Sequence, residues 1–463
     1  MNFNNLYNRL PVFMQNLACS VYGWKENKVR FNKEFEVLLE EYKLTQYFNV
    51  NSIEDYKLKK LALVLDNAYK TVPYYHKKFK ELNLVPTDIS SLELLNLLPV
   101  LTKEELRNNQ DLMVSNHYKS SCLHEVHTSG TTGKALTLFK TSESISAQWA
   151  IWFRHRSRFG VNKGDLHVNF TGKQVTPTSQ TSPPYWRFNA PANQYLINMQ
   201  HVTNDKIVDI VKFLNSIEPS FYSGYPSILA EIARLAVDRG VKLNHNSRPS
   251  VIFCGAENVL TYQKDILEKW TGAKVTDQYG LTEGNCNLSK CEFNNYHEDF
   301  EFGHVECYEP ELLPDGRKRG KVLGTSYSNL AMPLIRYLTG DIAIWASPEF
   351  KCPCGRSSAV IESIEGRIDD FIELNDGRRV MRFDYLFKGT DSVKEAQVCQ
   401  YRIGEVVIKI VLRDDDFYNV KEKLQKEFSK WICRETKLKV LQVEFIEKSP
   451  SGKFKSVKSF INN

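Results

Sequence analysis

The sequence predicts a chain of the α/β class with two domains. At 463 residues the chain is longer than one hydrophobic core normally supports. From residue 207 to residue 279, helical and strand-like apolar patterns alternate, which is typical of a largely parallel sheet flanked by helices. The C-terminal stretch has a separate pattern, with a strand at 405–412 and an amphipathic helix at 420–431. We therefore expect a large domain with mixed and parallel sheets over residues 1–366, and a small α+β domain over residues 367–463.

Composition narrows the class of protein. Apolar residues make up 42% and charged residues 25% of the chain, as in ordinary globular proteins. The net charge of +6 suits phosphate-bearing ligands but is too small and dispersed to indicate a nucleic-acid partner. The chain has no long apolar run of transmembrane length and no signal-peptide pattern, and its ten cysteines are spaced too unevenly for a disulfide framework. These features predict a cytoplasmic protein without a transmembrane segment.

Local patterns predict the elements in order. Apolar residues at helical spacing indicate a helix over 57–79 that breaks at Pro73, and Thr102 is a suitable N-cap for the next helix. Residues 142–159 form an aromatic-rich helix, which we expect to pack in the core. Residues 170–193 contain several prolines and predict a long irregular loop, a feature that is often functional. Helix and strand then alternate over 207–214, 220–222, 226–237, 251–254, 260–270 and 274–279.

A polar loop between two strand-like runs, 123–126 and 135–139, is the most distinctive local feature. Its glycines permit close backbone approach, its N–H groups form an anion-binding concavity and its lysine adds a positive charge, so the loop suits a polyphosphate. The spacing is not that of a Walker loop, which has four residues between its glycines and Ser or Thr after its lysine. A flexible hairpin turn is the alternative interpretation. The loop consists of Thr128, Ser129, Gly130, Thr131, Thr132, Gly133 and Lys134.

This loop resembles the phosphate loop of the adenylate-forming superfamily, which comprises acyl-CoA synthetases, peptide-synthetase adenylation domains and luciferases. The segments at 57–79, 99–105 and 321–345 resemble the phenylacetate–CoA ligase branch, and 170–193 resembles its capsule-biosynthesis relatives. The five signatures together are far more specific than any one of them. After the loop, the other four follow in the superfamily's order: YGLTE at 279–283, TGD at 339–341, GRIDD at 366–370 and PSGK at 450–453.

The resemblance implies a nucleotide site at the ends of the predicted strands. In the superfamily, a backbone segment and an aromatic residue flank adenine, and a threonine and a glutamate face the phosphates and Mg²⁺. An aspartate accepts both ribose hydroxyls, an arginine reaches the ribose–phosphate end, and a second aspartate is the hinge of a mobile lid. The matching residues are, in that order, Gly255, Ala256 and Glu257, then Tyr279 and Gly280, then Thr282 and Glu283, then Asp341, Arg367 and the hinge Asp369.

Lys453 is the candidate catalytic residue. It follows a glycine in the segment 449–455, which matches the C-terminal lysine motif of the superfamily. A lysine delivered by closure of the lid domain would stabilise the charge that develops when a carboxylate attacks the α-phosphate of ATP. The alternative interpretation is a basic tail, because Lys448, Lys455 and Lys458 lie nearby.

Three cysteines and a histidine are candidate ligands of a structural zinc ion. Cys291, His297, Cys352 and Cys354 form the ligand set of a closed tetrahedral site, and the segments around them are polar and turn-like. Zinc-containing relatives of phenylacetate–CoA ligase have a similar set. Buried free thiols are the alternative, and Cys286 is a substitute candidate.

These patterns predict an ATP-dependent enzyme that activates a small carboxylic acid as an acyl-adenylate, releases pyrophosphate and passes the acyl group to a thiol or amine acceptor. The resemblance implies ATP and Mg²⁺, with CoA as one candidate acceptor. Residues 375–380 depart from the glycine-rich loop that lines the pantetheine tunnel of CoA ligases, which favours other acceptors. The alternatives are a capsule or surface-polysaccharide enzyme that acylates an amino sugar, a coenzyme adenylyltransferase, and a non-catalytic ATP-binding protein of the same fold.

Overall fold

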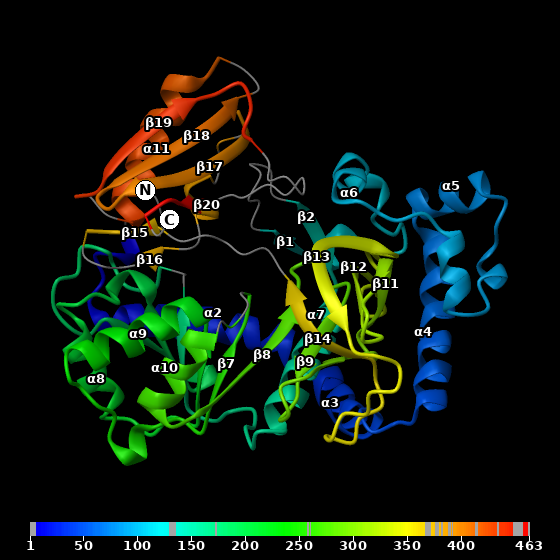
Figure 1. Cartoon of the computed structure of the whole chain (residues 1–463), viewed down its shortest axis with the longest axis horizontal. Helices are drawn as coiled ribbons and strands as arrows, with labels where there is room; N and C mark the ends of the chain where they lie inside the picture. The colour runs from blue at the N-terminus through cyan, green and yellow to red at the C-terminus, as the bar shows by residue number, and fades with distance from the viewer. Residues whose placement is uncertain are drawn as a thin grey trace.

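The computed structural model places most of the chain in one large body, with a C-terminal group of strands and a helix above it in the view of Figure 1. The large body contains a long mixed sheet, and the chain ends in the smaller group (Figure 1). The structure describes residues 6–128, 136–171, 174–256, 259, 261–365, 372–375, 379–380, 383–387, 390, 392–412, 415–432, 435–447 and 457–461.

The helices begin and end at residues that suit these positions. The predicted break at Pro73 is confirmed, because this residue occupies the first turn of a helix, where a missing N–H leaves no bond unmade. Thr102 is confirmed as an N-cap, since its Oγ1 accepts the N–H of Glu105 at 3.1 Å. None of the described helices is apolar over a stretch long enough to cross a bilayer. The helices are α2 (Val12–Arg30), α3 (Lys33–Thr45), α4 (Val50–Thr71), α5 (Pro73–Glu81), α6 (Lys103–Asn108), α7 (Ser142–Ser157), α8 (Ile207–Leu214), α9 (Pro226–Asp238), α10 (Thr261–Thr271) and α11 (Phe417–Trp431).

The strands of the large body are β1 (His124–His127), β2 (Thr137–Lys140), β3 (His167–Thr171), β4 (Trp186–Asn189), β5 (Gln194–Asn198), β6 (Phe221–Gly224), β7 (Val251–Cys254), β8 (Lys274–Gly280), β9 (Asn287–Lys290), β10 (Tyr296–Glu298), β11 (Gly303–Leu312), β12 (Lys318–Ser326), β13 (Tyr337–Trp345) and β14 (Val360–Glu365). The strands that follow are β15 (Ile372–Glu373), β16 (Arg379–Val380), β17 (Val393–Arg402), β18 (Glu405–Leu412), β19 (Lys437–Gln442) and β20 (Val457–Ser459).

One sheet of 12 strands runs through the large body in the order β11-β12-β13-β14-β10-β9-β8-β7-β6-β3-β5-β4. Strands β5, β3, β6, β7 and β8 pair in parallel, as the alternation of helix and strand predicts. Strand β8 joins this half to an antiparallel half that begins with β9. The α/β class and the mixed sheet are therefore confirmed, and β8 is the strand at which the two halves meet.

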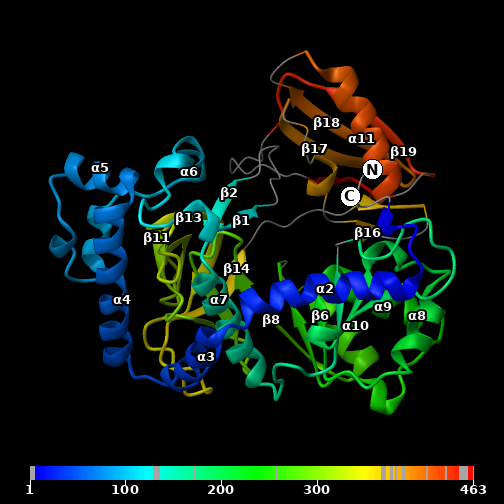
Figure 2. The same cartoon turned by 180° about the vertical axis from the view of Figure 1, so that it is seen from behind.

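Helices cover both faces of the parallel half. Every residue of β7 is buried, as expected for a strand that lies between two layers of helices. One core cluster, which includes Tyr222, Ile232 and Leu267, joins the strands to α8, α9 and α10. On the other face lie α2 and α7, and Figure 2 shows α2 crossing in front of the strands. The sheet is thus the middle layer of three.

The expectation of an irregular loop over residues 170–193 is wrong at both ends, because Phe170 and Thr171 complete β3 and a further strand lies near the other end. Residues 186–189 form β4, which pairs antiparallel with β5 at the edge of the sheet. The buried Arg187 holds this edge in place, since its guanidinium donates to Gln15 Oε1 on α2 at 2.6 Å and to the carbonyl of Pro184 at 2.8 Å. Prolines upstream obscured the strand in the sequence, and its pairing depends on a contact with the N-terminal helix.

The C-terminal strands β19, β18, β17 and β20 form a separate sheet, with β18 at the predicted residues 405–412. Its apolar residues, among them Val406, Ile408 and Leu424 of α11, make a core cluster of their own. This arrangement is what an independent small domain needs. The boundary at residue 366 stays a prediction, because residues 366–371 lie outside the described chain.

Candidate functional site

Strands β1 and β2 pair antiparallel and hold together the two ends of the predicted phosphate loop. The N–H of Thr128 donates to the carbonyl of Leu136 at 3.0 Å, and the N–H of Leu136 donates to Oγ1 of Thr128 at 3.0 Å. These bonds hold residues 128 and 136, which flank the predicted loop, side by side at the end of the β1–β2 pair. The remaining predicted loop residues lie outside the described chain: Ser129, Gly130, Thr131, Thr132, Gly133 and Lys134.

The carboxyl end of β7 leads directly into the predicted adenine-binding segment. Gly255 follows the strand, and its N–H donates to the carbonyl of Gly224 on β6 at 3.2 Å. Ala256 has a φ of +66°, a left-handed conformation that is uncommon for a residue with a Cβ. Such backbone strain is concentrated at functional sites in proteins. Glu257 lies outside the described residues, so two of the three predicted members are placed.

Tyr279 and Asp341 meet across the site. Tyr279 lies near the carboxyl end of β8 and Asp341 in the middle of β13, and the tyrosine hydroxyl donates to Oδ2 of the aspartate at 2.7 Å. Burial and the neighbouring Asp341 carboxylate raise the pKa of Tyr279 well above its ordinary value, so the hydroxyl remains a donor. The N–H of Asp341 donates to Oγ1 of Thr339 at 3.1 Å. The structure thus brings together a predicted adenine contact and the predicted ribose contact.

Glu283, the predicted magnesium ligand, lies in the turn after β8 and is buried. The hydroxyl of Tyr337 on β13 donates to its Oε1 at 3.0 Å. Lys140 at the end of β2 is also close: a Cβ on Gly284 would lie 3.0 Å from the lysine Nζ. Burial lowers the pKa of Lys140 to about 8, although the Glu283 carboxylate opposes this change. Gly280 and Thr282, which flank this turn, are exposed.

Sequence reasoning missed two residues that surround Glu283. Lys140 is the charged last residue of the short strand that follows the phosphate loop, and that position was an available signal. Tyr337 had no such signal, because it follows an apolar run and its contact with Glu283 depends on β13 lying beside the turn. The predicted Arg367, the hinge Asp369 and the catalytic Lys453 lie outside the described residues.

The four predicted zinc ligands gather in one place. One potential ligand atom from each of Cys291, His297, Cys352 and Cys354 lies within 4.8 Å of the others. The short β9–β10 turn and the long β13–β14 connection meet there because β10 pairs with both β9 and β14. The Sγ atoms of Cys291 and Cys352 are 3.7 Å apart, and Sγ of Cys354 is 3.2 Å from Nε2 of His297. Cys286 instead packs in a core cluster with Leu288.

The chemistry of this cluster fits a metal ion. Two thiolates on one tetrahedral zinc ion, with bonds of about 2.3 Å, would lie about 3.8 Å apart, close to the sulfur–sulfur distance here. Burial, together with the nearby guanidinium groups of Arg356 and Arg158, lowers the pKa of His297 to about 3. The ring is therefore neutral at physiological pH, the form in which imidazole binds a metal ion. The Nε of Arg356 donates to Sγ of Cys354 at 3.3 Å. The set can hold a structural zinc ion.

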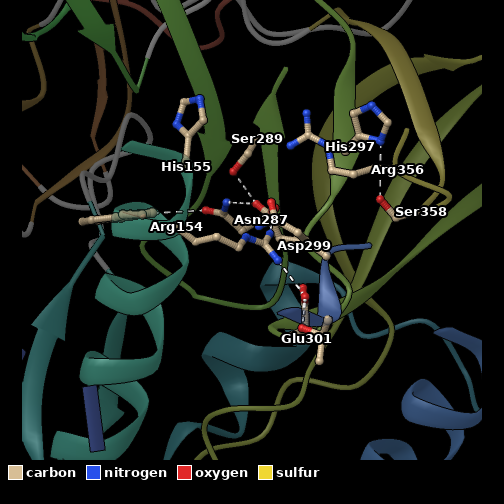
Figure 3. Close-up of polar contacts among 12 residues, drawn as sticks. Arg154, His155, Asn287, Ser289, His297, Asp299, Glu301, Arg356 and Ser358 are labelled. Carbon is tan, nitrogen blue, oxygen red and sulfur yellow. Dashed lines mark hydrogen bonds and ion pairs between the residues drawn. The ribbon is translucent and has the colours of Figure 1, made fainter. Parts of the chain in front are cut away.

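Behind the cluster, a buried ionic network ties α7 to the antiparallel half of the sheet. Figure 3 shows Arg154 reaching toward Asp299 and Glu301, and the ring of His297 facing Ser358. Arg154 is almost fully buried, and its Nη1 lies 2.7 Å from Oε1 of Glu301. Ser289 on β9 donates to Oδ2 of Asp299 at 2.6 Å. Because each charge has a partner, this network fixes the position of α7 beside the sheet.

Comparisons with known proteins agree with this geometry. A family model described as the CapK C-terminal domain matches residues 373–460. Protein CapK of Staphylococcus aureus is 26% identical over 465 residues, which cover 99% of each chain. A phenylacetate–coenzyme A ligase of Pseudomonas putida is 26% identical over 332 residues, which cover 70% of this chain and 72% of that protein. A ligase of the same name from Thermus thermophilus is 24% identical over 70% of this chain and 71% of that protein.

Solved structures show the same fold. The 2-hydroxyisobutyryl-CoA ligase in complex with its acyl-adenylate and CoA has a TM-score of 0.60, with 19% identity, over 90% of this chain and 91% of that chain. The same ligase in its postadenylation state has a TM-score of 0.56 over 90% and 91% of the two chains. The chain is therefore homologous to CapK and to the phenylacetate–coenzyme A ligases, and its fold is that of the adenylate-forming ligases.

Proposed function

We propose that this chain activates a carboxylic acid with ATP, forming an acyl-adenylate and pyrophosphate. The observation that carries the proposal is the meeting of Tyr279, Asp341 and Glu283 between β8 and β13, next to the hairpin that ends in the predicted phosphate loop. An aromatic ring, a carboxylate for ribose and a carboxylate for a metal ion are the groups that MgATP requires. Their arrangement in an adenylate-forming fold supports this reaction over ATP binding without catalysis.

The reaction forms one bond and breaks one. A carboxylate oxygen of the acid attacks the α-phosphorus of ATP, and the bond from that phosphorus to the pyrophosphate oxygen breaks. Asp341 would hold the ribose hydroxyls, and Tyr279, held by its bond to Asp341, would contact the adenine. Mg²⁺ held by Glu283 would neutralise phosphate charge. Tyr337 fixes the orientation of the Glu283 carboxylate, which preorganises that ligand before nucleotide binds.

The C-terminal unit would act as a lid. Its separate sheet and core suit a rigid body that turns about Asp369 and brings Lys453 to the α-phosphate. The lysine would then stabilise charge in the transition state rather than bind ATP. The two residues would thus have different roles: Asp341 would contact ATP before the lid closes, and Lys453 only after it has closed.

The cluster of Cys291, His297, Cys352 and Cys354 would hold a structural zinc ion rather than a catalytic one. Four protein ligands leave no open position for a substrate, and the ion would fasten the β9–β10 turn to the β13–β14 connection. The ion would therefore stabilise the antiparallel half of the sheet, which contributes Asp341 to the nucleotide site.

The acyl acceptor is proposed to differ from that of the phenylacetate–coenzyme A ligases. The chain aligns with CapK over 99% of its length but with the Pseudomonas putida ligase over 70%. The matched C-terminal family model is that of CapK. This difference, together with the departure of residues 375–380 from the glycine-rich loop of CoA ligases, favours an amine or amino sugar of surface-polysaccharide synthesis over CoA.

Pyrophosphate release tests the proposal. Purified protein is mixed with ATP, Mg²⁺ and single members of a panel of aryl and alkyl carboxylic acids, and pyrophosphate is measured with and without each acid. Acid-dependent release in wild type, and its loss in Asp341→Ala, would support acid activation. Hydrolysis of ATP that no acid stimulates, across the whole panel, would count against it. Addition of CoA, glucosamine or ethanolamine to an active mixture then identifies the class of acceptor.

A further inference from the structure

A pocket of about 500 Å³ lies on the face of the parallel half that α2 and α7 cover, away from α8, α9 and α10. Figure 2 views the molecule from this side, with α2 in front of the strands. Its volume is in the range of small-molecule sites. The rings that line it come from α2, α7, β6 and the α2–α3 connection: Trp24, Phe31, Trp149, Phe153 and Phe221.

Arg156 of α7 lines this pocket without an ionic partner. Within the described part of the chain, no carboxylate and no hydrogen-bond acceptor contacts its guanidinium; aromatic rings surround it instead, with centroids 4.9 Å (Phe153), 5.2 Å (Phe221) and 5.8 Å (Trp149) away. Burial and the nearby Arg30 lower the pKa of Arg156 to about 10, so the group still carries its charge at neutral pH. A partly buried cation without an anion is costly to maintain.

The other arginine at this pocket and one of its two lysines pair with carboxylates, while the second lysine, Lys28, lies over the ring of Trp24 at 3.6 Å. Arg30 forms an ion pair with Glu26 one turn away on α2, and Lys163 pairs with Glu36. On α7 itself, Arg154 is held by two carboxylates, two residues before Arg156. Of Arg30, Arg154 and Arg156, only Arg156 lacks a carboxylate partner within the described residues, and Lys28 is a second pocket cation without one.

Polar side chains of the strands β3, β5 and β6 form one wall of the pocket. The ring of His167 stacks on Phe221 with centroids 4.4 Å apart, and its Nε2 lies 2.9 Å from the side-chain nitrogen of Gln194. Asn169 donates to Oγ of Ser223 at 2.8 Å. These groups offer hydrogen bonds beside aromatic surfaces, a combination that orients a ligand as well as burying it.

The pocket is separate from the nucleotide site. His167 and Phe221 are the first residues of β3 and β6, whereas Ala256 and Tyr279 lie at or beyond the carboxyl ends of β7 and β8. Neighbouring parallel strands run in register, so the two sites lie toward opposite ends of strands about 10 Å or more in length. A carboxylate paired with Arg156 could not reach the α-phosphate of ATP in the proposed site.

We propose that this pocket is a second ligand-binding site for a small organic anion with a flat ring, whose carboxylate or phosphate group pairs with Arg156. The ring would pack against the faces of Trp149 and Phe153, and the polar wall would accept or donate further hydrogen bonds. The ligand would bridge α2, α7 and the sheet at a place distinct from the nucleotide site. This inference goes beyond the proposed reaction and does not depend on it.

Tryptophan fluorescence of the full-length protein tests the site, because Trp24 and Trp149 lie at the pocket. The probes are benzoate and phenyl phosphate, with benzamide and inorganic phosphate as the neutral and ring-free comparisons. Either aryl anion is expected to bind with a Kd on the order of 0.1–1 mM, as for ligands of that size. Both comparison compounds should bind at least about 10-fold more weakly. Tighter binding of phenyl phosphate than of benzoate would identify the anion as a phosphate, and the reverse as a carboxylate.

Variants locate the bound anion. Arg156→Met should weaken aryl-anion binding by about 10- to 100-fold, Arg156→Lys should retain part of it, and Arg239→Gln, which removes one positive charge elsewhere, should bind as wild type. Asp341→Ala should also bind the aryl anion normally, which separates this site from the nucleotide site. Unchanged binding in Arg156→Met, or loss of binding in Asp341→Ala, would overturn the proposal. If Arg156→Met does not fold, equal binding of benzoate and benzamide to wild type would overturn it as well.

Discussion

The hydroxyl of Tyr279 donates to Oδ2 of Asp341 at 2.7 Å, although the two residues are 62 positions apart in the chain. Tyr279 belongs to the last strand of the parallel half and Asp341 to a strand of the antiparallel half, so this bond links the two halves of the sheet. Burial keeps the tyrosine protonated, which means that it can only donate to the carboxylate. The bond therefore fixes the position of the Asp341 carboxylate.

Asp341→Ala is expected to weaken ATP binding by roughly 2–5 kcal/mol, because two ribose hydroxyls would lose a charged acceptor. Tyr279→Phe removes only the bond that orients the aspartate, so its effect on ATP affinity should be smaller, roughly 1 kcal/mol. Calorimetric titration with ATP measures both. The assignment of Asp341 is wrong if wild type and Asp341→Ala bind ATP equally well.

Wild-type protein is expected to carry about one zinc ion per chain, as elemental analysis can measure. Cys352→Ser should lose the metal and lower the midpoint of thermal unfolding at the same time, since binding of a structural ion contributes directly to folding. Cys122→Ser, at an exposed position outside the cluster, is the matched control and should retain both. Metal-free wild type with the stability of the untreated protein would refute the site.

Lys453→Ala is expected to leave ATP affinity nearly unchanged while adenylation falls by roughly 10²–10³, the usual loss for one preorganised charge-stabilising group. The reason is that the lysine would reach the α-phosphate only after the lid closes. Pyrophosphate exchange and a direct ATP titration on one preparation measure the two effects. Lys455→Ala removes a neighbouring charge and should behave as wild type. Abolished ATP binding in Lys453→Ala would make the lysine a ground-state contact and contradict the proposed mechanism.

His167 makes stability depend on pH below neutrality. Burial lowers its pKa to about 4, which is below the ordinary value of 6.5, so between these values the unfolded chain binds more protons than the folded one. Its neutral ring therefore contributes stability that is fully present above about pH 6.5 and is lost as the pH falls toward 4. The loss amounts to roughly 3 kcal/mol.

Denaturant unfolding at a series of pH values checks this expectation. His167→Gln should be less stable than wild type at neutral pH, where the stacking on Phe221 is lost, and its stability should fall less between pH 6.5 and 4. His245→Gln, at an exposed position, should follow the wild-type curve. Parallel pH curves for wild type and His167→Gln would show that this group does not titrate as the structure indicates.

Much of the fold was predictable from local pattern. Alternating helix and strand over residues 207–279 indicated the parallel half, and the strand at 405–412 was predicted at its actual limits. Pro73 and Thr102 marked helix ends through bonds made within a few residues. Strand β4 was missed because an edge strand of four residues has little local pattern, and its stability depends on α2 and β5.

The sequence by itself determined which residues were candidates, and the tertiary structure decided which of them meet. The motif order pointed to Tyr279, Asp341 and Glu283, and cysteine and histidine spacing pointed to the metal cluster. Only the pairing of β10 with β14 brings Cys291 near Cys352, and only the approach of β13 to the turn after β8 places Tyr337 on Glu283. The unpaired Arg156 could not be recognised beside Arg154 in the sequence, because their environments differ through long-range packing alone. Periodicity records which face of an element is buried, whereas the partner on that face is set by the order of strands in the sheet.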